Sequence, residues 1–264
     1  MQLKNKVAWI TGASSGIGEA LAKALAAEGV SVVLSARRKE ELERVQKECG
    51  LGNEHALVLP LDLADTRNID ALAAQVIEKF GRIDILVNNG GFSQRSLAQD
   101  TPVEIDRKIM EVNFFGQVAV TKSVLPQMIR QHSGNIIVIS SISGKFGFFL
   151  RSAYSASKHA LQGFFESLRL ETEEHGIQTL IVSPGKIRTN ISLNAVKADG
   201  SSHSQMDKST ETGLSAEACA AQIISAMKAG KEEVLIGGKE IKAVWIKRHF
   251  PGIFGKLIRK QERE

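Results

Sequence analysis

Cysteine and tyrosine are scarce in this chain of 264 residues, and long hydrophobic runs are absent. The two cysteines, Cys49 and Cys219, are too few and too far apart to indicate a disulfide framework, and we expect no metal site. No stretch approaches the roughly 20 apolar residues of a membrane-spanning helix. The first residues lack the apolar core of a signal peptide. These absences predict a protein of the reducing cytoplasm.

The chain also has only a small excess of positive over negative charge. The chain has 34 Lys and Arg against 29 Asp and Glu, a formal net charge of +5. This balance permits anionic ligands. No basic stripe interleaved with aromatic residues points to nucleic acid, and we expect none as a partner. The hydrophobic fraction of 43% is ordinary for one large globular domain.

Short β-branched runs alternate with longer helical stretches. We expect strands at about residues 7–11, 31–35, 55–60, 83–88, 135–140, 178–183 and 233–236, with helices between them. Gly81 should end one helix that Asp65 or Thr66 caps, and Ser215 should cap a later one. Apolar strands separated by helices predict a single doubly wound α/β domain of the Rossmann type, with a central parallel sheet flanked by helices on both faces.

The first expected strand runs into a glycine-rich turn, Thr11-Gly12-Ala13-Ser14-Ser15-Gly16-Ile17-Gly18. Gly12 permits a tight exit from the strand, Gly16 lets a diphosphate approach the backbone, and Gly18 lets the next helix lie close to the sheet. The spacing differs from the usual G-x-G-x-x-G pattern. The turn therefore predicts a dinucleotide site, with a tight structural connection as the alternative.

Two arginines follow the second expected strand, in Leu34-Ser35-Ala36-Arg37-Arg38. In this fold an acidic residue at that position binds a bare ribose hydroxyl, whereas an arginine accommodates a 2′-phosphate. No acid occurs before Glu40. Arg37 and Arg38 therefore favour NADP(H) over NAD(H). The alternative is a solvated start of the next helix.

Tyr154 is the only tyrosine, and Lys158 follows it by four residues. On a helix the two side chains share a face. An ammonium about 4 Å from a phenolate stabilises it by about 4 kcal/mol at an effective dielectric of 20, which is roughly three pK units. The pair predicts an acid/base catalyst in which Lys158 lowers the pKa of Tyr154. The alternative is a pair that only packs.

Taken together, these residues resemble the classical short-chain dehydrogenase/reductase family over about residues 6–236. The family's motifs occur in order as Thr11-Gly12-x-x-x-Gly16-x-Gly18, Asp62-Leu63, Asn88-Asn89-Gly90-Gly91, Val112-Asn113-Phe114-Phe115-Gly116, Ser141 thirteen residues before Tyr154, and Pro184-Gly185-Lys186-Ile187-Arg188-Thr189. Gly90 departs from the family's usual alanine without removing any chemistry. The C-terminal third, at residues 190–195 and 198–200, most resembles the dehydrogenase/reductase member 7 branch.

The resemblance implies four catalytic residues. Tyr154 would be the general acid/base, and Ser141 would orient the substrate oxygen. Lys158 would lower the pKa of Tyr154 and bond the nicotinamide ribose. Asn113 would interrupt a long helix and support a proton relay, unless it only bends that helix. The implied contacts to NADP(H) are Gly12, Ser14, Ser15, Gly16, Ile17, Gly18, Arg37, Arg38, Asp62, Leu63, Asn89, Gly90, Tyr154, Lys158, Pro184, Gly185, Ile187 and Thr189.

The resemblance also implies a small carbonyl or alcohol substrate. Its pocket should be surrounded by Gln94, Arg95 and Ser96, by residues 145–150 and by residues 191–213. Phe146, Phe148, Phe149 and Leu150 would form an apolar wall suited to a hydrophobic substrate, although some could serve a subunit contact. We expect a homodimer or homotetramer.

We divide the chain into a catalytic domain at residues 1–238, with a substrate lid at about 190–213, and a basic amphipathic tail at 239–264. Hydrophobic and basic residues alternate in the tail. It could pack on a neighbouring subunit or lie on an anionic membrane surface. Two alternatives to an NADP(H)-dependent oxidoreductase stay open, namely an inactive NADP(H)-binding regulator and a peripheral membrane protein that uses the tail.

Overall fold

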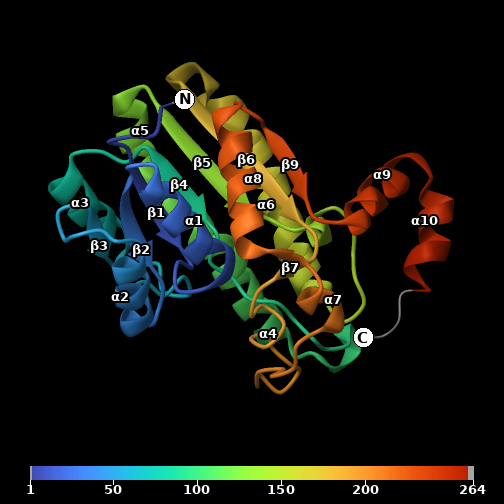
Figure 1. Ribbon diagram of the computed structural model, residues 1–264. Helices are drawn as coiled ribbons and strands as arrows, with labels where there is room; N and C mark the ends of the chain where they lie inside the picture. The colour runs from blue at the N-terminus through green and yellow to red at the C-terminus, as the bar shows by residue number, and fades with distance from the viewer. Residues whose placement is uncertain (1, 261–264) are drawn as a thin grey trace.

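The computed structural model describes residues 2–260, apart from the side chains of residues 208 and 209. A seven-stranded parallel sheet forms its centre (Figure 1). Its strand order is β3 (Ala56–Val58), β2 (Ser31–Ser35), β1 (Val7–Thr11), β4 (Ile85–Asn88), β5 (Gly134–Ile139), β6 (Ile177–Pro184) and β9 (Glu233–Ile236). The expected doubly wound α/β fold is confirmed.

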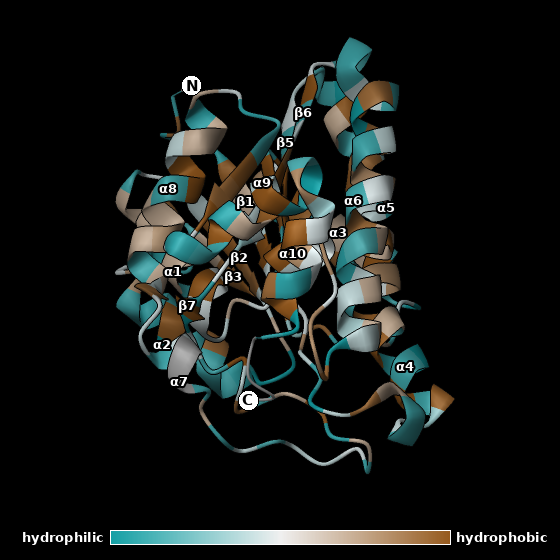
Figure 2. Cartoon of the chain, turned by 90° about the vertical axis from the view of Figure 1, so that its right-hand side faces the viewer, coloured by the Kyte–Doolittle hydropathy of each residue, from teal (hydrophilic) through white to brown (hydrophobic). Residues whose placement is uncertain are grey.

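Helices cover both faces of the sheet, as Figure 2 shows. One layer holds α1 (Gly16–Ala27), α2 (Lys39–Glu48) and α8 (Ala216–Lys228). The other holds α3 (Ile69–Phe80), α5 (Gly116–Gln131) and α6 (Ser152–Thr172). Successive side chains of a strand point to opposite faces. Ala8 and Ile10 of β1 therefore join one hydrophobic cluster, and Val7 and Trp9 join the other.

The remaining elements lie around the carboxyl ends of the strands, except for the 3-10 turn Glu173–His175, which leads into the amino end of β6. They are α4 (Val103–Met110), a π-helical turn (Glu111–Phe115), β7 (Ile187–Arg188), α7 (Lys208–Glu211), β8 (Leu214–Ser215), α9 (Lys242–His249), α10 (Pro251–Ile258) and 3-10 turns at Ala98–Asp100, Ile142–Gly144, Glu173–His175 and Lys239–Ile241. β7 and β8 pair as a separate two-stranded sheet. The sequence pattern predicted the helical region that holds α4, but it did not reveal the strand pair β7 and β8, helix α7 or the 3-10 turns.

The expected helix ends are partly confirmed. Gly81 ends α3 in the left-handed conformation at φ 71°, and the Ser215 side chain accepts a hydrogen bond from Ala218 N at 3.1 Å. The expected cap of α3 by Asp65 or Thr66 is wrong, because Asn68 holds that position. The Asp65 carboxylate instead binds Arg67 Nε at 2.8 Å.

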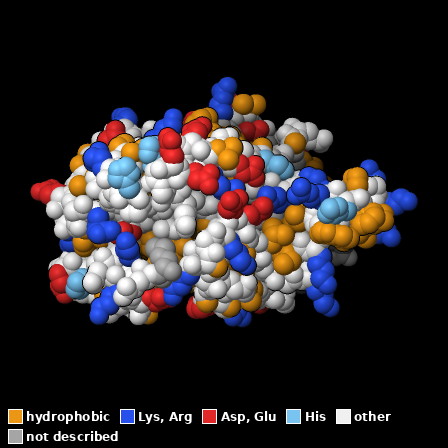
Figure 3. Space-filling model, turned by 90° about the horizontal axis from the view of Figure 1, so that it is seen from above, with side chains coloured by type: hydrophobic (Ala, Val, Ile, Leu, Met, Phe, Trp, Pro, Cys, Tyr) orange, Lys and Arg blue, Asp and Glu red, His pale blue; other side chains and the backbone are white. Residues whose placement is uncertain are grey.

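The tail forms two helices that lie to one side of the sheet (Figure 1). Pro251 opens α10, as its fixed φ favours at a first helical position. Trp245, Phe250, Ile253 and Leu257 are exposed there. Figure 3 shows hydrophobic and basic side chains gathered at this end of the molecule. Over residues 2–260, no helix is long and apolar enough to cross a bilayer.

Asp84 anchors the N-terminal edge of the sheet. Its carboxylate, 3% exposed, accepts hydrogen bonds from Lys6 Nζ at 2.9 Å, Arg82 Nε at 2.7 Å and Val7 N at 2.9 Å. Burial by itself raises the pKa of Asp84, but the bonds from Arg82, Lys6 and Val7 outweigh it and hold the pKa below its ordinary value of 3.8. Ionised Asp84 therefore stabilises the folded state.

We expect Asp84→Asn to lower the free energy of unfolding by about 2 kcal/mol at neutral pH. A group whose pKa falls on folding stabilises the fold above its unfolded pKa, and this contribution is lost as the pH falls through the folded value. The difference in the free energy of unfolding between Asp84→Asn and wild type should thus be largest at pH 7 and shrink below about pH 4. Urea unfolding across this range measures it. Asp100→Asn, at an exposed carboxylate, serves as a control that should change little. A difference between Asp84→Asn and wild type that does not depend on pH would contradict the ionic account.

Candidate active site

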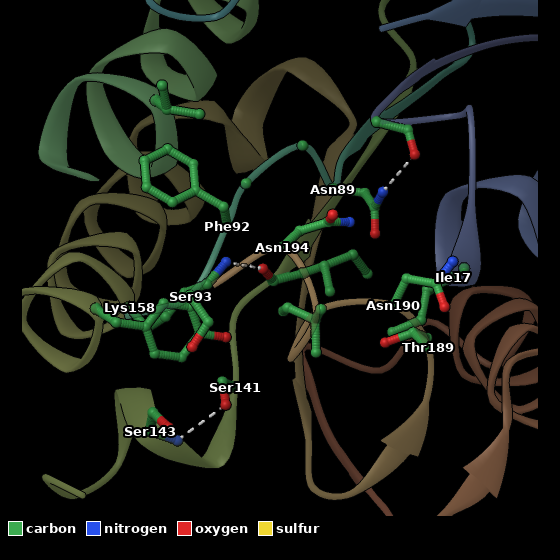
Figure 4. A pocket seen from close by; sticks show the side chains of 18 of the residues that line it. Ile17, Asn89, Phe92, Ser93, Ser141, Ser143, Lys158, Thr189, Asn190 and Asn194 are labelled. Atoms are coloured by element: carbon green, nitrogen blue, oxygen red, sulfur yellow. Dashed lines mark hydrogen bonds between the residues drawn. The ribbon is translucent and has the colours of Figure 1, made fainter. Parts of the chain in front are cut away.

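A cavity of about 770 Å³ opens at the carboxyl ends of the strands. In Figure 4, Ser141 and Lys158 lie on one side of it, and Ile17 and Thr189 on the other. Among the expected catalytic and cofactor-binding residues, all but Gly18 and Asn113 line this cavity. Of the residues expected around the substrate after β4, Arg95 lines it, whereas Gln94 and Ser96 do not. The fold thus brings together side chains that are far apart in the sequence.

The glycine turn forms one wall. Gly12 and Gly16 have φ of 64° and 59°, a region that side-chain-bearing residues rarely adopt. A Cβ on Gly18 would lie 2.3 Å from Gly12 O, so only glycine lets α1 approach the turn this closely. Asn89 Nδ2 donates to Thr11 O and to Gly12 O, both at 3.1 Å. The result is an open backbone cradle that leads into the N-terminus of α1, which suits a diphosphate.

The structure explains why residue 90 is a glycine. A Cβ at this position would lie 2.4 Å from Leu63 Cδ1. Leu63 lines the same cavity, and Gly90 O accepts a hydrogen bond from Gln117 Nε2 at 2.6 Å. The glycine therefore makes room for Leu63 where the family usually has alanine.

Three polar residues lie at the adenosine end that the fold predicts. Arg37 and Arg38 follow β2, are exposed and line the cavity. Asp62, also exposed, lies beyond β3, and its carboxylate accepts a hydrogen bond from Ala64 N at 3.0 Å. No acidic side chain stands at the end of β2, so the guanidinium groups set the charge there.

Ser141, Tyr154 and Lys158 meet at the opposite end. Ser141 follows β5, and its hydroxyl takes part in a side-chain hydrogen bond with Tyr154. Its oxygen also accepts from Ser143 N at 3.0 Å (Figure 4). Lys158 is buried and donates from Nζ to Ile139 O at 2.8 Å. The Nζ lies 5.8 Å from the centre of the Tyr154 ring.

The electrostatics differ from our expectation. Burial raises the pKa of Tyr154, and the hydrogen bond with Ser141 and the charges of Arg151 and Arg95 lower it only in part. Lys158 is not among the groups that shift it, because its ammonium is directed to Ile139 O. Burial also lowers the pKa of Lys158, to about 8. The expectation that Lys158 makes this phenol acidic is therefore wrong for this structure.

Asn113 interrupts the long helical region, as expected. It lies in the π-helical turn between α4 and α5 and is fully buried. Its side-chain amide makes two hydrogen bonds to the backbone of Phe92. It accepts one from Phe92 N at 3.0 Å and donates the other to Phe92 O at 2.9 Å. It also donates to Ser157 Oγ at 3.2 Å. Asn113 thus ties the segment after β4 to the helix that carries Tyr154 and Lys158.

Gln94 was expected to border the substrate, and this is wrong, because the residue is fully buried outside the cavity lining and positions helix α6 instead. Its buried side-chain oxygen accepts from Ala153 N at 2.9 Å and from Tyr154 N at 3.3 Å, so it caps the first turn of α6. Side-chain caps usually come from a residue adjacent to the helix. Here the cap comes from 60 residues earlier, and no local pattern could signal it.

The apolar wall is only partly confirmed. Phe146 and Phe148 line the cavity, with ring centres 4.8 Å apart. Phe149 and Leu150 do not line it, and Phe149 is exposed. The tail completes this wall from within the same chain. Phe254 of α10 packs edge-on against Phe146 at 4.8 Å, and Ile258 lines the cavity.

Comparison with known proteins points to one family. A family model described as short chain dehydrogenase matches residues 6–200. The chain is 43% identical over 267 residues to "Dehydrogenase/reductase SDR family member 7B" of Mus musculus, covering 99% of this chain and 83% of that protein. It is 43% identical to "Dehydrogenase/reductase SDR family protein 7-like" of Drosophila melanogaster, covering 98% and 81%. The likeness to this branch spans nearly the whole chain, and a special likeness of the C-terminal third stays a prediction.

Solved structures share the fold. A short-chain dehydrogenase from Streptomyces avermitilis superposes with a TM-score of 0.80 at 31% identity, over 96% of both chains. A short chain dehydrogenase/reductase from Burkholderia phymatum in complex with NAD gives a TM-score of 0.84 at 22% identity, also over 96% of both chains.

The glycine turn gives a direct test. We expect Gly18→Ala to lower the free energy of unfolding by about 1–3 kcal/mol, because its Cβ would be driven into Gly12 O. The displaced turn should also weaken dinucleotide binding. Gly163→Ala is the matched control, since a Cβ there meets nothing within 4 Å. Thermal unfolding and NADPH fluorescence titration measure both effects, and a Gly18 variant that behaves like the Gly163 variant would rule out the close approach.

Proposed function

The chain belongs to the short-chain dehydrogenase/reductase family, and we propose that it is an NADP(H)-dependent oxidoreductase that interconverts a carbonyl compound and an alcohol. One observation carries this proposal. A buried phenol hydrogen-bonded to Ser141 lies in the same cavity as a glycine cradle shaped for a dinucleotide. Ser141, Tyr154, Lys158 and Asn113 are the proposed catalytic set.

The raised pKa of Tyr154 defines its role at neutral pH. The phenol keeps its proton, so it acts as the acid that protonates a carbonyl oxygen. Ser141 orients that oxygen by a second hydrogen bond, which strengthens as negative charge develops on it. In the reverse direction Tyr154 accepts the proton of the alcohol.

The residues present fit a nicotinamide dinucleotide. The cradle at Gly12 and Gly16 suits its diphosphate, and the exposed Arg37 and Arg38 suit a 2′-phosphate, which guanidinium groups bind in a bidentate manner. When bound, such a cofactor supplies or accepts the hydride. Lys158 Nζ lies 5.8 Å from the centre of the Tyr154 ring and donates to Ile139 O, so it would return a proton to the phenol through a bridging hydroxyl or water. Its pKa of about 8 makes that exchange accessible near neutral pH.

Several expectations remain predictions. They concern the cytoplasmic location, the homo-oligomer, the division at residue 238 and the lid at 190–213. The tail packs on its own chain through Phe254, which supports a role in closing the substrate pocket. The exposed Trp245, Ile253 and Leu257 leave apolar surface for a neighbouring subunit or an anionic membrane. The complete proposed catalytic set disfavours an inactive regulator.

Tyr154→Phe tests the catalytic assignment. Removal of the only phenol should lower kcat by about 10²–10⁴-fold, since general acid catalysis is lost. The ring stays in place, so the Kd for NADPH should change little. A panel of ketones and aldehydes, followed by absorbance of the reduced nicotinamide, measures turnover. Retention of wild-type kcat on the best substrate would exclude Tyr154 as the acid.

The cofactor preference is tested separately. We expect Arg37→Ala combined with Arg38→Ala to weaken NADPH binding by about tenfold or more and to leave NADH binding nearly unchanged, because only NADPH offers the phosphate. The neighbouring Lys39→Ala, which removes an exposed charge outside the cavity lining, is the matched control. Fluorescence titration gives the ratio of dissociation constants. An unchanged ratio in the double variant would remove the argument for NADP(H).

A further inference from the structure

A buried arginine, Arg95, and a half-buried arginine, Arg151, lie beside Tyr154, where a hydrophobic pocket alone would not need them. Arg95 follows β4, and its side chain is 4% exposed. Arg151 immediately precedes α6, three residues before Tyr154. Both line the cavity, and both lower the pKa of Tyr154 through their charge. The two guanidinium groups are therefore close to the reacting oxygen.

One carboxylate bridges them. Asp207, which comes from the segment just before α7, pairs with Arg95 and lies 3.2 Å from Arg151. Burial by itself raises the pKa of Asp207, but the hydrogen bond from Arg95 and the two positive charges hold it below the ordinary value. Asp207 is consequently ionised, and the buried cluster carries two positive charges against one negative charge.

The cluster leaves hydrogen-bonding capacity unused. Within residues 2–260, the Nε atoms of Arg95 and Arg151 are both buried without a partner. Arg95 has other bonds, from its guanidinium to Ser93 Oγ at 3.0 Å and to Gln94 O at 2.7 Å. A buried donor without a partner is costly, and an excess positive charge in a cavity attracts an anion. The Nε atoms have no accessible surface toward the cavity, so it is the excess positive charge that points to an acidic ligand.

We propose that Arg95 and Arg151 form a carboxylate seat that selects oxo acids as substrates, and that Asp207 occupies this seat until the substrate carboxylate replaces it. The inference rests on the proposed oxidoreductase function. The pairing with Asp207 shows that these guanidinium groups bind a carboxylate. Asp207 lies outside the cavity lining, so a substrate would reach the two arginines from the cavity side. Phe148, whose ring lies 5.5 Å from the Arg151 guanidinium, and Phe146 would hold the apolar part of the same substrate.

The reaction balances with the groups named. Tyr154 donates its proton to the carbonyl oxygen while the carbonyl carbon receives a hydride from NADPH, so the oxo acid becomes a hydroxy acid and NADP⁺ is formed. The substrate carboxylate is unchanged, and Lys158 returns a proton from solvent to the Tyr154 oxygen. Asp207 takes no part in the bond changes.

Matched acids and esters test the seat. Benzoylformate and benzoylpropionate place a carboxylate at two separations from the ketone, and their methyl esters remove its charge. Calorimetric titration of the protein saturated with NADP⁺ should show each well-seated acid binding roughly tenfold to a hundredfold more tightly than its ester. Arg151→Gln should abolish that preference, and Arg151→Lys should keep only part of it, because a lysine lacks the bidentate fork.

Asp207→Asn gives the decisive contrast. If the aspartate occupies the seat, its removal should tighten acid binding by roughly tenfold and leave ester binding unchanged. Lys108→Gln, which removes an exposed charge on the same cavity, should alter neither. Equal binding of acids and esters by wild type, or weaker acid binding by the Asp207 variant, would overturn the proposal. Binding is measured without turnover, so failure of the proposed catalysis would appear separately, as a lack of NADPH oxidation with the acid preference intact.

Discussion

The hydrogen bond from Lys158 Nζ to Ile139 O joins helix α6 to the end of strand β5, and the arrangement of the site depends on this junction. Ser141 follows β5, whereas Tyr154 and Lys158 lie on α6. A second bond, from Ser140 Oγ to Lys158 O at 3.1 Å, holds the same two elements together. Because these hydrogen bonds fix α6 against β5, Ser141 and Tyr154 are held next to each other before a substrate binds.

The cavity joins two chemically different halves. Backbone groups of the glycine turn and two exposed arginines form one half, and aromatic rings with buried charges form the other. The tail reaches both halves. Phe254 and Ile258 lie at the second half, and Glu240, which lines the cavity, accepts a hydrogen bond from Lys186 N at 2.8 Å beside Gly185. Change at Phe254 and Ile258 can therefore reshape the substrate end and leave the glycine turn as it is, whereas change at Glu240 would disturb the segment at Gly185 and Lys186.

Local patterns allowed much of this site to be predicted from the sequence. The four-residue spacing of Tyr154 and Lys158 and the glycines at 12, 16 and 18 are short-range signals with a direct structural meaning. Contacts over long separations left no such signal. Arg95 and Asp207 are 112 residues apart, and Gln94 caps a helix 60 residues away. The sign of the Tyr154 pKa shift was missed because it depends on burial and on where Lys158 points, which spacing does not determine.

The π-helical turn at Glu111–Phe115 has a consequence for how the chain tolerates change. Such a turn holds one more residue than a regular helical turn. Each α-helical residue advances the helix by about 100°, so loss of one residue here would straighten the helix and rotate α4 by that angle against α5. Asn113 would then leave Phe92, and Ile109 would turn out of its hydrophobic cluster. The positions of Asn113 and Ile109 thus depend on the number of residues in this turn as much as on which residues they are.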